Sequence, residues 1–229
     1  DDLGGIIVEP FQRLLPPAPG FLETLRDLAS EYSIPLIFDE VVTGFRFAYG
    51  GAQAYYGVTP DICALGKLIG GGFPMAAIAA KEEFMVHFDK NAVADGEFMP
   101  QIGTLSGNPV AAVAGLATLK VLKQPGIYDN LFATGKRLMQ GLESFLEDAG
   151  VEAQVIGEPP LFDVFFTSSE LKDYRGMQGN DIDKANQFNA ALRENGVLKG
   201  DSKFYVSIAH DDVDVEKTLA AFNLAVAAV

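Results

Sequence analysis

The chain has 229 residues, of which 48% are hydrophobic and 21% charged, a balance that supports a folded core and argues against intrinsic disorder. Its 31 aspartates and glutamates outnumber its 17 lysines and arginines, so the net charge is −14, which disfavours nucleic acid and anionic membranes as partners. It has a single cysteine, no secretory signal pattern and no membrane-length apolar run, so we expect a soluble, cytoplasmic protein.

The first half of the chain contains short apolar strands separated by helical and loop segments. The strands are continuous apolar runs, as is typical of a parallel sheet that is covered on both faces. After Pro19, apolar residues recur at helical spacing from Leu22 to Tyr32. These patterns predict an open, mostly parallel α/β sheet. Its expected strands are residues 6–8, 35–39, 62–65 and 75–80.

The second half of the chain predicts a small α+β domain. Its composition changes between residues 109 and 125, and we divide the chain into a first domain at residues 1–112 and a second at residues 113–229. Asp211 or Asp212 is available as the N-cap of the last helix. The expected helices are residues 110–122, 127–149, 183–194 and 213–227, and the expected strands are residues 161–166 and 204–208.

An acidic residue, Asp39, ends a wholly apolar strand, and Glu40 follows it. Three interpretations are open for this carboxylate. It caps the next loop or pairs with Arg46, it holds magnesium in a nucleotide-binding strand, or it pairs with a protonated ring nitrogen. The magnesium interpretation requires an upstream glycine-rich phosphate loop ending in Lys-Ser or Lys-Thr, and the sequence has none.

Lys67 follows an apolar strand and Gly66, and three further glycines come soon after it. Most lysines are solvated surface residues. This one has apolar or glycine neighbours on both sides, and no acidic residue stands between Asp61 and Lys81. Partial desolvation favours the neutral, nucleophilic amine, so Lys67 is a candidate nucleophile.

A loop rich in glycine and hydroxyl groups, residues 103–109, leads into a predicted helix. Its amides and hydroxyls are suited to a phosphate, although the same pattern also forms an ordinary turn and N-cap. Two histidines and one cysteine give no metal-ligand spacing, so we expect no metal site.

Taken together, these motifs resemble the class III pyridoxal-phosphate aminotransferases, most closely the glutamate-1-semialdehyde aminomutase branch. The resemblance extends over essentially the whole chain, and several motifs occur in a consistent order and spacing. The segments that carry it are LIFDEVVTGFR at residues 36–46, GGAQAYYGVTPD at 50–61, LGKLIGGGFP at 65–74, GTLSGNP at 103–109 and VSIAHDD at 206–212.

The resemblance implies the large domain of the fold-type I pyridoxal-phosphate transferases, followed by a small C-terminal domain. It implies that Lys67 forms a Schiff base with the aldehyde of pyridoxal 5'-phosphate and then moves a proton on the substrate. Asp39 would keep the pyridine nitrogen protonated, and Val41 would pack on the ring face, although Val41 is equally explained as a core residue. Thr104 would bind the cofactor phosphate of the neighbouring subunit in a homodimer. Glu9 matches a family glutamate near the substrate, but it is at least as well explained by a structural pair.

The sequence departs from the family in two places. Family members carry a long segment upstream of the strand at residues 6–8, including a phosphate-binding turn and an aromatic residue that stacks on the ring, and we therefore expect this chain to be a C-terminal portion. In the aminomutase branch a glutamate precedes the closing motif, and Ser202 stands in that place here. This difference favours an ordinary aminotransferase, with a small-molecule amino donor and a keto or aldehyde acceptor. Lys199, Lys203 and Arg175 are candidates to meet an acidic group of the substrate.

The alternatives are an aminomutase that moves an amino group within one molecule, and a non-catalytic fragment that folds only with a missing N-terminal part or serves as a dimerisation partner. Unpaired apolar strand edges at residues 6–8 and 36–38 would support the fragment.

Overall fold

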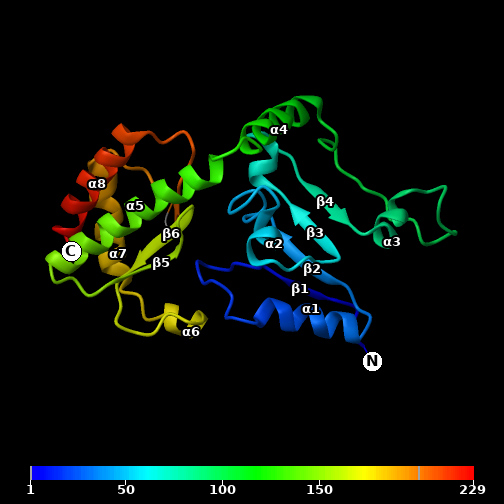
Figure 1. Ribbon diagram of the computed structural model, residues 1–229, viewed down its shortest axis with the longest axis horizontal. Helices are drawn as coiled ribbons and strands as arrows, with labels where there is room; N and C mark the ends of the chain where they lie inside the picture. Colours follow the sequence, from blue (N-terminus) through cyan, green and yellow to red (C-terminus); the bar gives the residue numbers. More distant parts are fainter. Residues whose placement is uncertain (1, 201) are drawn as a thin grey trace. The chain divides into compact units, whose positions relative to one another are not determined.

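The computed structural model describes residues 2–200 and 202–229. The chain forms two compact units, each with its own sheet (Figure 1). The first unit comprises Asp1–Phe11 and Pro17–Pro125, and the second comprises Gln12–Pro16 and Gly126–Val229. The predicted functional division, with a cofactor-binding domain at residues 1–112, stays a prediction.

The first unit is built on a four-stranded sheet in the order β1 (Ile6–Val8), β2 (Leu36–Glu40), β3 (Ile62–Leu65) and β4 (Ala77–Ala80). The first three strands are parallel, and β4 runs antiparallel to β3. The expectation of a mostly parallel sheet is therefore confirmed. Four strands were predicted within about two residues of their bounds because their apolar runs are bounded by glycine, proline or charged residues.

Helix α1 (Phe21–Glu31) covers β2. Its buried residues Leu22 and Ala29 pack with Leu36 and Phe38 of the strand in one apolar cluster. The helix begins after Gly20, whose φ is +81°, so Pro19 lies outside the helix. A left-handed backbone conformation favours glycine, and here it sets the start of the helix.

Several short helical segments follow the strands of the first unit. Helix α2 (Gly51–Tyr56) was not predicted, because it has only six residues and two glycines stand at its start. The 3₁₀ turn η1 (Lys67–Gly70) follows β3 directly. Helix α3 (Glu82–Met85) and the 3₁₀ turn η2 (Val86–Phe88) follow β4.

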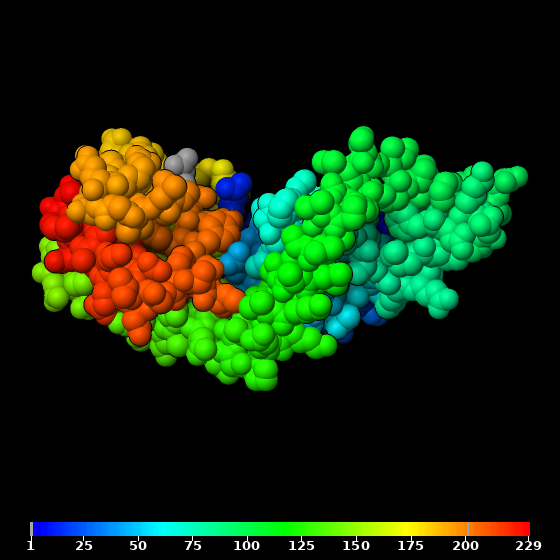
Figure 2. All heavy atoms as spheres, turned by 90° about the horizontal axis from the view of Figure 1, so that it is seen from above, coloured from blue at the N-terminus to red at the C-terminus, as the bar shows by residue number. Residues whose placement is uncertain are grey.

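Helix α4 (Pro109–Leu122) supports the turn at η1. Asn108 caps it by accepting hydrogen bonds from the amides of Val110 at 2.9 Å and Ala111 at 3.3 Å. A Cβ atom added at Gly115 would lie 2.3 Å from the carbonyl oxygen of Ile69, so glycine is what lets the helix approach η1. The outer side of α4 lies on the surface (Figure 2), where Val113 is 67% exposed.

The second unit packs three helices on an antiparallel sheet in the order β5 (Gln154–Glu158), β6 (Leu161–Phe165) and β7 (Phe204–Tyr205). The helices are α5 (Ile127–Asp148), α7 (Ile182–Glu194) and α8 (Asp212–Val226), and the short α6 (Tyr174–Met177) lies between β6 and α7. The core contains the fully buried side chains Leu142, Phe162, Phe188, Leu192 and Phe222. The predicted α+β architecture is thus confirmed.

Three details of this unit differ from the prediction, the first being helix α6, which lies where no helix was predicted. Strand β5 was not predicted, and β7 ends at Tyr205 instead of continuing to residue 208. The chain turns there, because the amide of His210 donates to the carbonyl of Ser207. Asp211 is the N-cap of α8 and forms a capping box with Asp214.

Within the described part of the chain, no helix has the length and apolar character that a membrane crossing requires.

Candidate active site

Asp39 and Lys67 come from neighbouring parallel strands. Asp39 of β2 lies opposite Ala64 of β3, and Glu40 lies opposite Leu65. Lys67 follows the end of β3 by two residues. Because parallel strands end at the same edge of a sheet, the register places the Asp39 carboxylate and the Lys67 turn at one edge of the sheet, where α/β proteins bind their ligands.

Lys67 has an unusual backbone conformation. Its φ is +46°, in the left-handed region that residues other than glycine seldom adopt. Its side chain is exposed, so the partial desolvation expected from its neighbours in the sequence does not hold within this chain. Among residues 2–200 and 202–229 its amine has no hydrogen-bond or ion-pair partner. Strain of this kind persists where the surrounding structure holds it, and it is concentrated at functional sites. The fold therefore presents an unpaired amine at the strand end.

The Asp39 carboxylate is half-buried, and only one of its two oxygens accepts a hydrogen bond within the described chain. Its Oδ1 atom accepts a hydrogen bond from the amide of Val41 at 3.0 Å. No hydrogen bond reaches its second oxygen from any residue that the structure describes. The carboxylate is oriented by the main chain and keeps one oxygen to accept a hydrogen bond from a ligand.

Val41 joins the two strand ends. A Cβ atom added at Gly66 would lie 3.2 Å from Cγ1 of Val41, so the valine side chain lies against the backbone that leads into Lys67. Asp39, Val41 and the backbone that leads into Lys67 thus lie at one edge of the sheet. Glu9 follows β1, which pairs with β2 through Val8 and Phe38, so Glu9 lies at the same edge of the sheet and is exposed.

Thr104 is separate from this group. It is exposed, in a loop whose turns are closed by hydrogen bonds from the amide of Ser106 to Gly103 and from the amide of Asn108 to Leu105. The loop borders a cavity of about 380 Å³ whose lining in the described chain includes none of the three clustered residues. Within a single chain the structure does not unite Thr104 with Lys67.

Glu40 is the residue that sequence reasoning missed. It is fully buried, although glutamate is among the residues least often buried, and it accepts hydrogen bonds from main-chain and side-chain donors of α2 and the preceding turn. Its position beside Asp39 in a strand was the available signal, because successive residues of a strand point to opposite faces. If Asp39 faces the ligand edge, Glu40 faces the interior.

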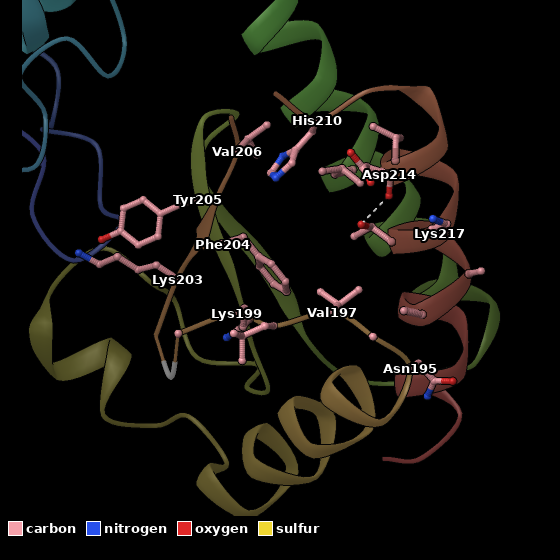
Figure 3. Close-up of a pocket in the computed structure, with 18 of the residues that line it drawn as sticks. Asn195, Val197, Lys199, Lys203, Phe204, Tyr205, Val206, His210, Asp214 and Lys217 are labelled. Carbon is pink, nitrogen blue, oxygen red and sulfur yellow. Dashed lines mark hydrogen bonds between the residues drawn. The ribbon is translucent and has the colours of Figure 1, made fainter. Parts of the chain in front are cut away.

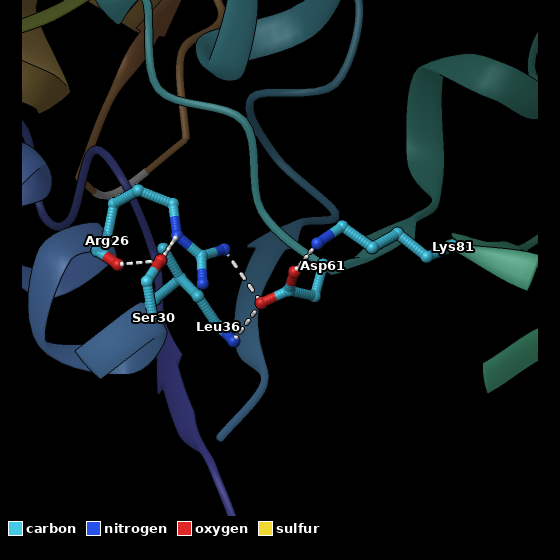
Figure 4. Close-up of polar contacts among 5 residues, drawn as sticks. All are labelled: Arg26, Ser30, Leu36, Asp61 and Lys81. Carbon is cyan, nitrogen blue, oxygen red and sulfur yellow. Dashed lines mark hydrogen bonds and ion pairs between the residues drawn. The ribbon is translucent and has the colours of Figure 1, made fainter. Parts of the chain in front are cut away.

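Asp61 lies at the opposite end of β3 and forms a structural centre (Figure 4). Its carboxylate accepts hydrogen bonds from the Leu36 amide at 2.8 Å, from Arg26 Nη1 at 2.7 Å and from Lys81 Nζ at 2.5 Å. Burial alone would raise the pKa of Asp61, but these bonds outweigh it and lower the pKa to about 2. The centre ties α1, β2 and β4 to β3.

The second unit contains a larger cavity of about 760 Å³ beside β7 and α8 (Figure 3). Phe204 and Tyr205 point in opposite directions from β7, as successive strand residues do. His210 Nδ1 accepts a hydrogen bond from the amide of Ser207 at 3.2 Å, so the imidazole helps to hold the turn after β7. The cavity lining includes none of Asp39, Val41, Lys67 and Thr104.

Lys199 also borders this cavity, but its ammonium is engaged. Its Nζ lies 2.9 Å from Oδ1 of Asp163, and both side chains are about 95% buried. The sequence suggested Lys199 as a contact for an acidic substrate group; the structure instead pairs it within the core of the second unit.

The chain is similar to known proteins along almost its whole length. The family model "Aminotransferase class-III" matches residues 1–212. The glutamate-1-semialdehyde 2,1-aminomutase of Natranaerobius thermophilus is 43% identical over 225 residues, which are 96% of this chain and 51% of that protein. The chain therefore spans about half the length of the curated relatives it matches.

Solved structures of transaminases are also similar to almost the whole chain. An omega-transaminase from Sphaerobacter thermophilus is 35% identical with a TM-score of 0.91, over 99% of this chain and 52% of that one. A structure described as a transaminase with PLP bound is 28% identical with a TM-score of 0.86, again over 99% of this chain and 52% of that one.

Proposed function

Because this chain belongs to the class III aminotransferases, we propose that it binds pyridoxal 5'-phosphate and transfers an amino group from a small-molecule donor to a keto or aldehyde acceptor. The observation that carries the proposal is the unpaired amine of Lys67, which follows the end of β3 at the same edge of the sheet as the Asp39 carboxylate near the end of β2.

The residues present suit this cofactor. The cofactor's aldehyde reacts with an amine, and its pyridine nitrogen stays protonated when it is paired with a carboxylate. Lys67 and Asp39 supply these two groups from adjacent strands. Val41 and the backbone of Gly66 offer an apolar contact beside them for a flat ring. When bound, the cofactor supplies an electron sink for the pair released when the substrate loses its Cα proton.

The chain's own residues then have distinct tasks. The Lys67 amine would hold the cofactor through its aldehyde and, once displaced by a substrate amine, would move the proton at Cα of the substrate. Asp39 would hold a proton on the ring nitrogen, through the oxygen that does not bond to the Val41 amide. Val41 would hold the ring orientation by packing. No group of three or more metal-ligating side chains occurs in the described ranges, and none is needed for these tasks.

A second candidate is an intramolecular amino transfer, as the name of the Natranaerobius thermophilus relative states. Ser202 stands where the aminomutase branch has a glutamate, and this favours an ordinary aminotransferase. The two reactions separate in one assay. An aminotransferase consumes one keto or aldehyde acceptor for each donor, whereas an aminomutase isomerises its substrate with no acceptor.

The wider proposal includes a cytoplasmic homodimer in which Thr104 contacts the cofactor phosphate of the other subunit, and a functional division after residue 112. The exposed position of Thr104 in a loop at the N-terminus of α4 supports a contact made outside its own chain. Light scattering checks the mass, and a monomer at micromolar concentration would contradict this part of the proposal.

The cofactor assignment is tested by adding pyridoxal phosphate, reducing with borohydride and mapping the modified lysine by mass spectrometry. We expect modification at Lys67 that is lost in Lys67→Ala. The matched control is Lys120→Ala, which removes an exposed lysine from α4 and should leave the modification of Lys67 unchanged. Labelling spread over surface lysines, with no preference for Lys67, would overturn the assignment.

A further inference from the structure

Glu40 is a buried carboxylate for which the proposed reaction has no direct use. It is fully buried at the end of β2, one residue after Asp39. A buried carboxylate is costly unless hydrogen bonds compensate for lost hydration. The way in which this one is satisfied links it to the candidate active site.

Main-chain and side-chain donors surround the Glu40 carboxylate, and the Cys63 thiol lies 3.9 Å from Oε1. Oε2 accepts hydrogen bonds from the Ala52 amide at 2.5 Å and the Thr43 hydroxyl at 3.1 Å. Oε1 accepts from the amide of Gln53 at 3.2 Å and from its side chain at 3.0 Å. A Cβ atom at Gly51 would lie 2.4 Å from Oε2, and this glycine has a φ of +75°, so only glycine fits there. Glu40 thereby fastens the start of α2 to β2.

The same residue closes the turn that carries Val41. The carbonyl of Glu40 accepts a hydrogen bond from the amide of Gly44 at 2.9 Å, and its carboxylate accepts the Thr43 hydroxyl. The Val41 amide, within this turn, donates to Oδ1 of Asp39, and the Val41 side chain lies against Gly66. The turn held by Glu40 thus orients the Asp39 carboxylate and the packing beside Lys67.

We propose that Glu40 is a positioning residue for the Asp39–Lys67 site, which acts by holding the turn at residues 41–44 so that the Asp39 carboxylate and the Val41 side chain face the cofactor ring. The inference rests on the proposed function. It differs from a purely structural role because it predicts that cofactor binding, and not only stability, depends on the Glu40 carboxylate.

The test compares Glu40→Gln with Asp61→Asn. Both replace a buried carboxylate of the same sheet by its amide, but Asp61 lies at the other end of β3, away from Lys67. In Glu40→Gln one acceptor oxygen becomes an NH₂ group that faces N–H donors, so the turn must shift. For each protein three quantities are measured: urea stability, the pyridoxal phosphate concentration for half-maximal borohydride labelling of Lys67, and the induced circular dichroism of the bound cofactor.

We expect Glu40→Gln to raise the half-maximal concentration about tenfold or more and to weaken the induced circular dichroism. Asp61→Asn should lose stability yet stay within about twofold of the wild type in both cofactor measurements. Equal effects of the two variants on the cofactor, or no effect of Glu40→Gln, would overturn the inference.

A milder variant keeps the test decisive if Glu40→Gln does not fold. Thr43→Val keeps the buried shape but removes one donor to Oε2, and it should raise the half-maximal concentration about threefold. An unchanged value in a folded Thr43→Val protein would then count against the inference. If the wild-type chain itself shows no labelling at Lys67, the proposed function fails and the positioning role fails with it.

Discussion

Lys199 Nζ lies 2.9 Å from Oδ1 and 3.0 Å from Oδ2 of Asp163, and this ion pair is buried in the second unit. The lysine also lies over the ring of Phe204, with Nζ 4.9 Å from the ring centroid. The pair joins β6 to the segment that leads into β7. Burial raises the pKa of Asp163, and the lysine opposes that rise.

We predict that Lys199→Met destabilises the chain by about 3 kcal/mol, because it leaves the Asp163 carboxylate buried without its partner. The double variant Asp163→Leu with Lys199→Met should recover much of that loss, since no buried charge then remains. Urea unfolding measures both. Lys172→Met, which removes the exposed pair with Glu170, is the control and should change stability little. A loss in Lys199→Met no larger than in the control would contradict the prediction.

The Asp61 centre predicts a pH dependence of stability. The pKa of Asp61 is lowered in the folded chain from the ordinary 3.8 to about 2, so the folded state favours the ionised carboxylate. Its contribution, about 2 kcal/mol, is complete above pH 4 and is lost as the pH falls from about 4 towards 2. Unfolding of wild type and Asp61→Asn should therefore differ at neutral pH and converge in acid. A gap that stays constant across this range would refute the explanation.

Gly66→Ala tests the contact that joins Val41 to the Lys67 turn. The added methyl would lie 3.2 Å from Val41 Cγ1, closer than ordinary packing, while the extended backbone of Gly66 accepts alanine without strain. We expect a stability cost of about 1 kcal/mol, together with a clear loss of pyridoxal phosphate labelling at Lys67. Gly4→Ala, which meets nothing within 4 Å, should change neither quantity. Undiminished labelling in Gly66→Ala would show that this contact does not position the lysine.

Cys63 should be inert in the folded chain. Burial, followed by the nearby negative charge of Glu40, raises the pKa of the Cys63 thiol to about 12. At pH 8 the thiolate is then about a thousandfold scarcer than in an unfolded chain. Alkylation by iodoacetamide, timed by mass spectrometry with and without urea, checks this. Comparable rates in the two states would disprove it.

The family and most of the local structure were predictable from the sequence. Asp39 at the end of an apolar strand and Lys67 after another were recognisable from adjacent residues, and most strands and helices follow from short-range periodicity. Those features depend on residues a few positions apart in the sequence, so they can be recognised without knowing the tertiary structure. Thr104 was also identified from the sequence. Its proposed contact, the cofactor phosphate of the other subunit, lies outside a single chain.

Which distant groups meet depends on the tertiary structure. Glu40 is satisfied by Gln53, thirteen residues away, and Asp61 bonds to Arg26, thirty-five residues away. Lys199 pairs with Asp163, thirty-six residues away, whereas the sequence had suggested Lys199 as a contact for an acidic group of the substrate. Such contacts depend on strand register and on how loops bring the chain back, and periodicity does not encode these long-range relations.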